Sequence, residues 1–261
     1  MLSAVWAYRY FIISSIRSEL KSRFARSKLG ALWMVLHPLA QVLVYALVLS
    51  QVMRAKIPAV ETQYAYPIYL LSGIIAWTLF AEILQRSLNI FIVNGNLMKK
   101  MRFPKLVLPL IVIGTALVNF MIFLVVMFVV FAALGHFPYH ALYWLPLLVL
   151  LTIALASGIG LFLGTLNVFI RDIGQFTEVM MQFWFWLTPV VYMISIVPEQ
   201  FRPLIYLNPM TGIVLGFQNV LLYDKAPDIS LLVYPTIFAL ISLGAALIVF
   251  YKAREEMADV L

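Results

Sequence analysis

The side chains that could do chemistry in this 261-residue chain are few and poorly placed for catalysis. His136 and His140 bracket a Phe-Pro-Tyr segment, but Pro138 disfavours the helix that would align the two imidazoles, and no third metal ligand accompanies them. Ser157 precedes a glycine within an apolar run, and none of the three histidines is obviously placed to act as its base. We therefore expect neither a catalytic residue nor a metal site.

The acidic residues argue against transport driven by protons or ions. A secondary transporter keeps ionisable groups near the middle of the membrane, whereas Glu82, Asp172 and Glu178 fall at the ends of apolar segments. Glu82 and Arg86 are four residues apart and can pair on one helix face. The polar residues Gln41 and Asn119 are interpreted as packing contacts.

The sequence also lacks a nucleotide-binding motif. The chain has no phosphate-binding loop in which Lys is followed by Ser or Thr, so we expect ATP and Mg²⁺ to be bound by a partner subunit and no cofactor by this chain. The chain has no cysteine, which excludes disulfides, thiolate metal sites and a cysteine nucleophile.

The composition places these residues in a membrane protein. Apolar and aromatic residues make up 64% of the chain, charged residues make up 11%, and the mean hydropathy is +1.00. A helix needs roughly 20 apolar residues to cross the hydrocarbon core. We predict an all-α polytopic protein with six transmembrane helices, at residues 31–53, 67–84, 107–134, 145–168, 179–197 and 231–251, of which the fifth is interrupted by proline.

The distribution of Lys and Arg predicts the orientation of these helices. Fourteen of the 18 basic residues fall in segments on one side of the predicted bundle, and such segments stay in the cytoplasm. Both termini should therefore be cytoplasmic, in a multi-pass protein of the bacterial inner membrane without a cleaved signal peptide. Membrane topology also explains the net charge of +7, so nucleic-acid binding is a poor alternative.

We predict one membrane domain over residues 1–261, with short appendages before and after a core at 31–251. Residues 1–30 have apolar residues at steps of three or four, which indicates an amphipathic helix on the inner membrane surface. This helix is either a membrane anchor alone or also a contact for a cytoplasmic partner. Residues 252–261 form a cytoplasmic tail.

The connection at residues 94–104 is predicted to be a short cytoplasmic coupling helix. An Asn-Gly turn precedes it, Pro104 interrupts the helix after it, and the residues between form one apolar face suited to docking on a soluble protein. The alternative is a basic segment held at lipid headgroups. The docking residues would be Asn96, Leu97, Met98, Lys99, Lys100 and Phe103.

Three further segments complete the pattern. Gly160 and Gly164 have the spacing that lets helices approach closely, which we assign to packing within the chain ahead of a subunit contact. The fourth span ends at Arg171 and Asp172, which anchor the helix end or contact a partner. Residues 198–223 are too apolar for an ordinary loop, and their arms around Asn208 and Pro209 are too short to cross, so we predict a re-entrant helical hairpin at the outer surface.

Aromatic residues form the last signal. Their faces can stack on the C–H faces of sugar rings without fixed hydrogen bonds, which suits a sliding polymer. The alternative for each is a lipid-interface belt or ordinary packing. The candidate channel residues are Trp33, Tyr45, Phe183, Trp184, Trp186 and Tyr192.

Taken together, these segments resemble the permeases of polysaccharide-export ABC transporters. The resemblance is carried by residues 27–38, by the connection from Asn96 to Pro104, by the exit at 167–172 and by the Asn208-Pro209 hairpin, and it covers essentially the whole chain. Exporters of lipid-linked O-antigen look most similar, with capsule and teichoic-acid exporters near them.

The resemblance implies a homodimer of six-span subunits bound to two ATP-binding subunits. It also implies that residues 94–103 form the coupling helix, that the N-terminal helix lies at an interface, and that aromatics of the first and fifth spans line a channel for a lipid-linked polysaccharide. Export of a drug or small amphiphile by the same class of transporter is the alternative function.

Overall fold

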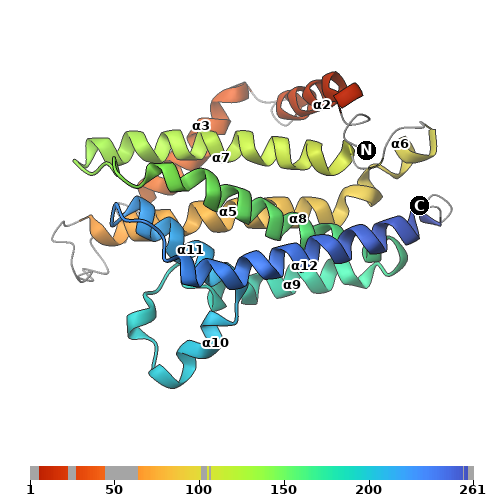
Figure 1. The fold of residues 1–261 in the computed structure, drawn as a ribbon. Helices are drawn as coiled ribbons and strands as arrows, with labels where there is room; N and C mark the ends of the chain where they lie inside the picture. The colour runs from red at the N-terminus through yellow and green to blue at the C-terminus, as the bar shows by residue number, and fades with distance from the viewer. Residues whose placement is uncertain are drawn as a thin grey trace.

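The computed structural model describes residues 6–22, 28–44, 64–100, 105, 107–254 and 256–257. Within these ranges the chain is helical and contains no strand. Figure 1 shows the long helices running roughly alongside one another in a bundle. The α-helices are α2 (Arg9–Ser22), α3 (Trp33–Val44), α5 (Ala65–Val93), α6 (Gly95–Lys100), α7 (Val107–Ala133), α8 (Leu145–Phe169), α9 (Asp172–Leu187), α10 (Arg202–Tyr206), α11 (Pro209–Leu221) and α12 (Ile229–Ala253).

Four helical segments are long and apolar enough to cross a membrane. They are α5, α7, α12 and the continuous stretch Leu142–Phe169 that contains α8, and a fifth is added if the bent pair α10 and α11 counts as one span. The predicted second, third, fourth and sixth spans coincide with these four segments. The first predicted span is described only as α3, since residues 45–53 lie outside the described ranges.

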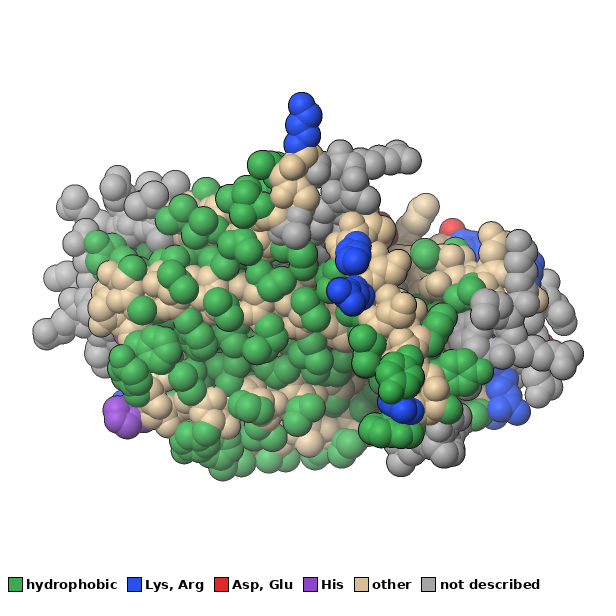
Figure 2. Space-filling view, turned by 90° about the horizontal axis from the view of Figure 1, so that it is seen from above, with side chains coloured by type: hydrophobic (Ala, Val, Ile, Leu, Met, Phe, Trp, Pro, Cys, Tyr) green, Lys and Arg blue, Asp and Glu red, His purple; other side chains and the backbone are tan. Residues whose placement is uncertain are grey.

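The surface over these helices has the character expected of a membrane protein. Figure 2 shows a broad hydrophobic area over the middle of the molecule, with the visible Lys and Arg side chains gathered toward one half. The basic residues at the end of the bundle that carries α6 include Lys99, Lys105, Arg171, Lys252 and Arg254, whereas Arg202 and Lys225 lie toward the other end. We refer to these as the α6 end and the α10 end.

The predicted fifth span at 179–197 is wrong in its bounds. Its helix, α9, begins at Asp172 and stops at Leu187, and Thr188 is extended with φ −98° and ψ 135°. The cause is Pro189, because a residue before proline is pushed out of the α region and proline cannot continue the hydrogen-bond ladder. α9 is therefore an amphipathic helix of 16 residues, too short for the candidate spans.

The buried chain after α9 is stabilised by side chains from other helices. Tyr69 Oη donates to the Tyr192 carbonyl at 2.8 Å, and Tyr66 Oη donates to the Val191 carbonyl at 3.0 Å. From α11, Gln218 Nε2 donates to the Pro189 carbonyl, also at 3.0 Å. These donors satisfy carbonyl groups that would otherwise be unpaired in an apolar interior.

The centre of the bundle is a seam in which α8 lies between α5 and α12. A Cβ atom at Gly164 would lie 2.3 Å from the Ser87 backbone oxygen of α5, and one at Gly158 would lie 2.3 Å from Ser242 Oγ of α12. Gly160 approaches the Leu84 backbone of α5 in the same way. The prediction that the small residues of this span serve packing within the chain is confirmed.

The segment predicted to be a re-entrant hairpin contains two helices that meet at 98° across the Asn208-Pro209 turn. Its arms have different surroundings. α11 is buried along most of its length, and a Cβ atom at Gly212 would lie 2.2 Å from the Leu231 carbonyl oxygen of α12. α10 is exposed, with Leu204 and Leu207 among its uncovered apolar residues.

Candidate functional site

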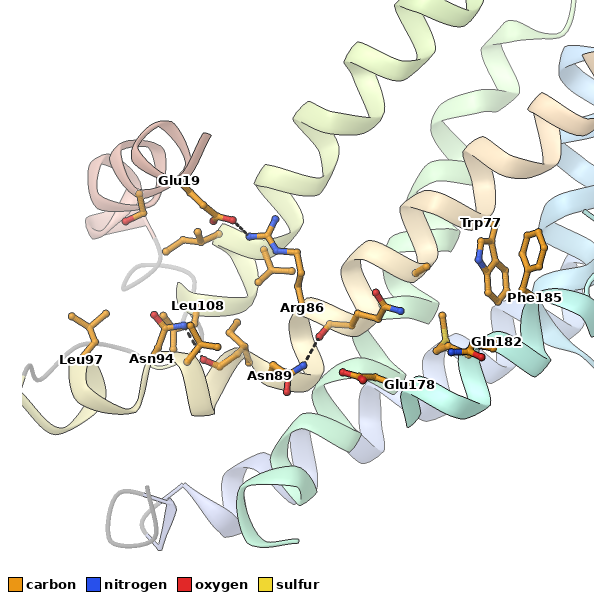
Figure 3. Close-up of a pocket in the computed structure, with 18 of the residues that line it drawn as sticks. Glu19, Trp77, Arg86, Asn89, Asn94, Leu97, Leu108, Glu178, Gln182 and Phe185 are labelled. Atoms are coloured by element: carbon orange, nitrogen blue, oxygen red, sulfur yellow. Dashed lines mark hydrogen bonds and ion pairs between the residues drawn. The ribbon is translucent and has the colours of Figure 1, made fainter. Parts of the chain in front are cut away.

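A groove of about 1130 Å³ lies near the α6 end and is shown in Figure 3. Residues of α2, α5, α6, α7 and α9 line this groove. It exists because α5 continues past its predicted end at Leu84 as far as Val93, which places the last turns of α5 opposite α9. α2 reaches the site by packing on α7, where Ile16 lies directly over Gly114.

A network of charged and polar side chains begins at one wall of the groove, where Glu19 and Arg86 line it, and extends behind that wall. Arg86 of α5 is ion-paired with Glu19 of α2 and, at 3.3 Å, with Glu82 one turn earlier on α5. Asn119 of α7 donates to the same Glu82 oxygen at 2.6 Å, and Thr115 donates to Glu19 at 3.3 Å. The predicted Glu82–Arg86 pair is confirmed, and Asn119 contacts this pair across two helices.

The rest of the groove combines amides, one carboxylate and aromatic rings. Gln85 and Asn89 come from α5, and Glu178 and Gln182 come from α9; Figure 3 shows Glu178 across from Asn89. Trp77 and Phe185 meet edge to face with ring centroids 5.5 Å apart. Amides and carboxylates exchange hydrogen bonds with hydroxyl groups, and aromatic rings cover the apolar faces of sugars, so this lining suits a polyhydroxylated ligand.

The charge of the groove limits what it can bind. Among the described residues that line it, Arg86 is the one cation, and it is ion-paired with the carboxylates of Glu19 and Glu82. Glu178 adds a further negative charge on the opposite wall. The part of the lining that the structure describes therefore favours a neutral, hydroxyl-rich group over an anionic one.

The aromatic residues predicted to line a channel are divided among several places. Trp186 lines the groove, and its neighbour Phe183 is 61% exposed on the outer surface of α9. Trp33 of α3 lines a separate cavity of about 460 Å³ and lies 5.1 Å from the His37 ring. Tyr192 belongs to the hydrogen-bonded chain after α9, and Tyr45 lies outside the described ranges.

Trp184 and the predicted hairpin turn are brought together. Trp184 stacks edge to face on Phe80 of α5, and its indole Nε1 donates to Asn208 Oδ1 at 2.7 Å. The same oxygen caps α11 by accepting from the Met210 backbone N–H at 2.9 Å, while Asn208 Nδ2 donates to Thr188 Oγ1 at 2.8 Å. Pro209 follows as the first residue of α11. The turn is thereby attached to the end of α9.

Sequence reasoning missed several lining residues. Trp77, Gln85 and Asn89 lie on one face of α5, and the last two were beyond the predicted end of that span. Their spacing of eight and then four residues is a signal of a shared helix face that could have been found. The pairing of this face with Gln182 and Phe185 of α9 depends on tertiary packing.

The predicted coupling segment contains a real but short helix, α6. Met98 is buried and Leu97 is partly buried against an apolar cluster, whereas Asn96 and Lys99 are exposed. The Lys100 side chain and Phe103 lie outside the described parts of the structure. α6 thus has one face packed on the bundle and another available to a partner.

The exit from α8 is fixed by an asparagine that sequence reasoning placed in the segment without assigning it a contact. Asn167 Nδ2 donates to the Leu88 carbonyl of α5 at 3.1 Å, and its Oδ1 accepts from the Gly174 backbone N–H at 3.0 Å. Arg171 and Asp172 at the start of α9 are exposed. The side chain of Asn167 therefore links the end of α8 to both α5 and the first turn of α9.

The two histidines considered for metal binding lie near the α10 end with separate partners. His136 Nε2 is 2.9 Å from the Leu221 carbonyl, and His140 Nδ1 is 2.7 Å from Asp224 Oδ2. Burial alone would raise the pKa of Asp224, but hydrogen bonds from the His140 side chain and from the Ala141 and His140 backbone outweigh it, so this pKa lies below its ordinary value. The pair fastens one inter-helix connection to another.

Comparison with known proteins agrees with this architecture. The family model described as ABC-2 type transporter matches residues 10–222. The O-antigen export system permease protein RfbA of Myxococcus xanthus is 30% identical over 261 residues, which cover 99% of this chain and 98% of that protein. A protein of the same name from Klebsiella pneumoniae is 29% identical over 93% of this chain and 92% of its own length.

A more distant relative extends the comparison to another polymer. The polysialic acid transport protein KpsM of Escherichia coli is 24% identical over 243 residues, or 91% of each chain. The relatives are similar along nearly their whole length, and the family model covers most of this chain. The chain belongs to the ABC-2 type transporter family.

Proposed function

We propose that this chain is the membrane-spanning subunit of an ABC exporter that moves a lipid-linked polysaccharide of the O-antigen type across the cytoplasmic membrane. The observation that carries the proposal is the full-length similarity to permeases named for O-antigen export, joined to a groove whose amides and aromatic rings suit sugars. The groove lies at the α6 end, where we place the cytoplasm because the basic residues gather there.

The finer topology is part of the same proposal. α3 is the beginning of a first span, α9 with the chain after it occupies the position of the fifth, and six spans result when these join the four long helices. α2 lies along the inner membrane surface, since Tyr10 and Ile13 on it and Trp6 just before it are exposed apolar residues. α10 and α11 form a re-entrant pair at the outer surface, and the burial of α11 supports this placement.

The functional unit is proposed to be a homodimer with two ATP-binding subunits. α9 buries only Gly174, Thr177 and Met181, and its exposed face carries Phe176 and Phe183, which a second copy would cover. Since no nucleotide-binding loop occurs in the sequence, ATP and Mg²⁺ belong to the partner. α6 would receive the motion of that partner and pass it to the first and fifth spans.

The function is tested by deleting the gene in its host. We expect loss of polysaccharide from the cell surface and accumulation of the lipid-linked polymer inside, and a plasmid copy of the gene should restore export. Normal surface polymer with increased sensitivity to drugs would overturn the proposal and favour the alternative, export of a small amphiphile. Reading frames for an ATPase and glycosyltransferases beside the gene would agree with polymer export.

The role of α6 is tested by reversing an exposed charge. Lys99→Glu leaves the packed face of α6 intact, and we expect affinity for the ATP-binding subunit to fall about fivefold, which corresponds to roughly 1 kcal/mol for an exposed pair. Lys225→Glu is the matched control, because it makes the same charge change at an exposed site near the α10 end. Affinity would be measured by co-purification and titration in detergent. Equal effects of the two variants would contradict the assignment.

A further inference from the structure

The C-terminal end of α12 lies in the same apolar cluster as α6. This cluster consists of Ile90, Phe91, Met98, Leu108, Val112, Val168, Phe250 and Met257, with Leu97, Leu161 and Ala253 packed around it. Figure 1 shows α6 and the end of α12 at the same end of the bundle. Met257 lies beyond the end of the helix in the chain, yet it is fully buried. A residue expected in a free tail is therefore part of the support beneath α6.

Two further contacts hold the C-terminal end of α12 in place. Phe250 of α12 stacks on Phe91 of α5, with ring centroids 5.6 Å apart and an angle of 21° between the rings. Lys105, just before α7, donates through Nζ to the Arg254 carbonyl at the end of α12. α6 has six residues, too few to be stable alone, so its position depends on this packing.

The other end of α12 is attached to the turn between α10 and α11. Tyr234 Oη donates to the Leu207 carbonyl at 2.8 Å, next to Asn208 in the turn. The Gly212 backbone lies so close to the Leu231 carbonyl that a Cβ atom would clash. The 25 residues of α12 make a helix about 37 Å long, and the two attachments lie toward its opposite ends.

We propose that α12 couples α6 mechanically to the hairpin turn at the opposite membrane surface. Phe250 and Met257 are positioning residues at one end, and Tyr234 is a positioning residue at the other. A displacement of α6 shifts the cluster beneath it, and α12 carries this shift to the Leu207–Asn208 peptide. This inference rests on the proposed role of α6, and it adds a route that does not pass through the first or fifth span.

The test uses accessibility of the hairpin as its readout. The sequence lacks cysteine, so a single cysteine in place of exposed Leu204 can be labelled from outside with a membrane-impermeant maleimide. We expect the labelling rate to differ between nucleotide-free complexes and complexes trapped with ATP analogue and Mg²⁺. Met257→Ala should reduce this difference about fivefold or more, the lower range of coupling between sites. The amount of assembled complex is measured in parallel, and labelling rates are compared per assembled complex.

Matched variants separate coupling from folding. Leu240→Ala truncates an exposed residue of α12 distant from both attachments and should preserve the nucleotide-dependent difference, as should the conservative Met257→Leu. Tyr234→Phe removes one hydroxyl at the hairpin and should reduce the difference as Met257→Ala does. Tyr139→Phe is its control, an exposed tyrosine at the same end of the bundle.

Each outcome decides between the possibilities. If Tyr234→Phe and Met257→Ala leave the nucleotide-dependent difference intact, or if the hairpin of the parent protein shows no difference, the inference is overturned even when Lys99→Glu weakens the complex as expected. If Met257→Ala does not assemble, Tyr234→Phe carries the decision. If Lys99→Glu and Lys225→Glu change the affinity for the ATP-binding subunit equally, the proposed role of α6 is wrong. That result would not bear on the attachment of α12 to the hairpin turn.

Discussion

The consecutive helices α8 and α9 are held in the bundle in opposite ways. α8 is wedged between α5 and α12, and three of its glycines meet backbone or side-chain atoms of those neighbours. α9 buries three residues and is attached chiefly at its ends, by Asn167 at the start and by Trp184 and Thr188 through Asn208 at the finish. α8 is therefore fixed in the seam, whereas α9 can change its position.

This contrast indicates where transport movements can take place. Close helix contacts through glycine have no space for sliding, because interiors pack at high density. A helix attached at two ends can rotate or tilt while those attachments hold. α9 also forms one wall of the groove, so its movement would change the width of the groove without disturbing the α5–α8–α12 seam.

The largest expected effect comes from filling the seam. Gly164→Ala places a Cβ atom against the Ser87 carbonyl oxygen, and we expect a loss of about 1–3 kcal/mol of stability from overpacking. Gly244→Ala in α12 is the matched control, since no atom lies within 4 Å of its Cβ position and alanine favours helix. Thermal unfolding in detergent would compare them. If both variants unfold at the parental temperature, α8 is not a fixed element.

A smaller effect is expected at the attachment of α9. Asn208→Ala removes the cap of α11 and the partner of the Trp184 indole, which should cost about 0.5–2 kcal/mol. Asn208→Asp keeps the accepting oxygen and loses the amide donor to Thr188 Oγ1 and to the Leu187 carbonyl, so it should fall between the parent and the alanine variant. Hydrogen exchange should increase in α9 and not in α8. A uniform increase would contradict independent attachment.

The smallest effect concerns the connection that precedes α8, through Asp224 and His140. Because the folded-state pKa of Asp224 is lowered, its stabilisation is present above the unfolded pKa of about 3.9 and is lost as the pH falls through the folded pKa. At neutral pH, Asp224→Asn should therefore unfold at a slightly lower temperature than the parent. The loss in free energy of unfolding should be less than about 1 kcal/mol, as for an exposed pair. Melting scans from pH 7 downward should show the two curves converging in acid.

Hydropathy alone was enough to predict the long helices, because four segments of at least 25 residues are almost uniformly apolar. It failed for α9, whose amphipathic sequence continues into apolar residues past Pro189, so a window average could not detect where the helix stops. The Asn208-Pro209 break was predictable from turn chemistry, but the burial of α11 and exposure of α10 depend on neighbours.

The candidate site was less predictable than the fold. The Glu82–Arg86 pair results from spacing on one helix, whereas Glu19 joins it from a helix more than 60 residues away. Met257 was expected in a cytoplasmic tail, and nothing in the local sequence indicates that it is buried in the same cluster as Met98 of α6. The position of Glu19 and the burial of Met257 both depend on contacts between segments that are far apart in the sequence.

The chain after α9 has an unusual consequence for sequence change in this protein. In a membrane protein, a more hydrophobic side chain at a buried position is usually harmless. Tyr66, Tyr69 and Gln218 are different, because each donates a hydrogen bond to a backbone carbonyl in the non-helical chain after α9. Phenylalanine or leucine at these positions would leave that carbonyl buried without a hydrogen-bond donor. Selection for greater lipophilicity would therefore meet resistance at these three positions while being tolerated around them.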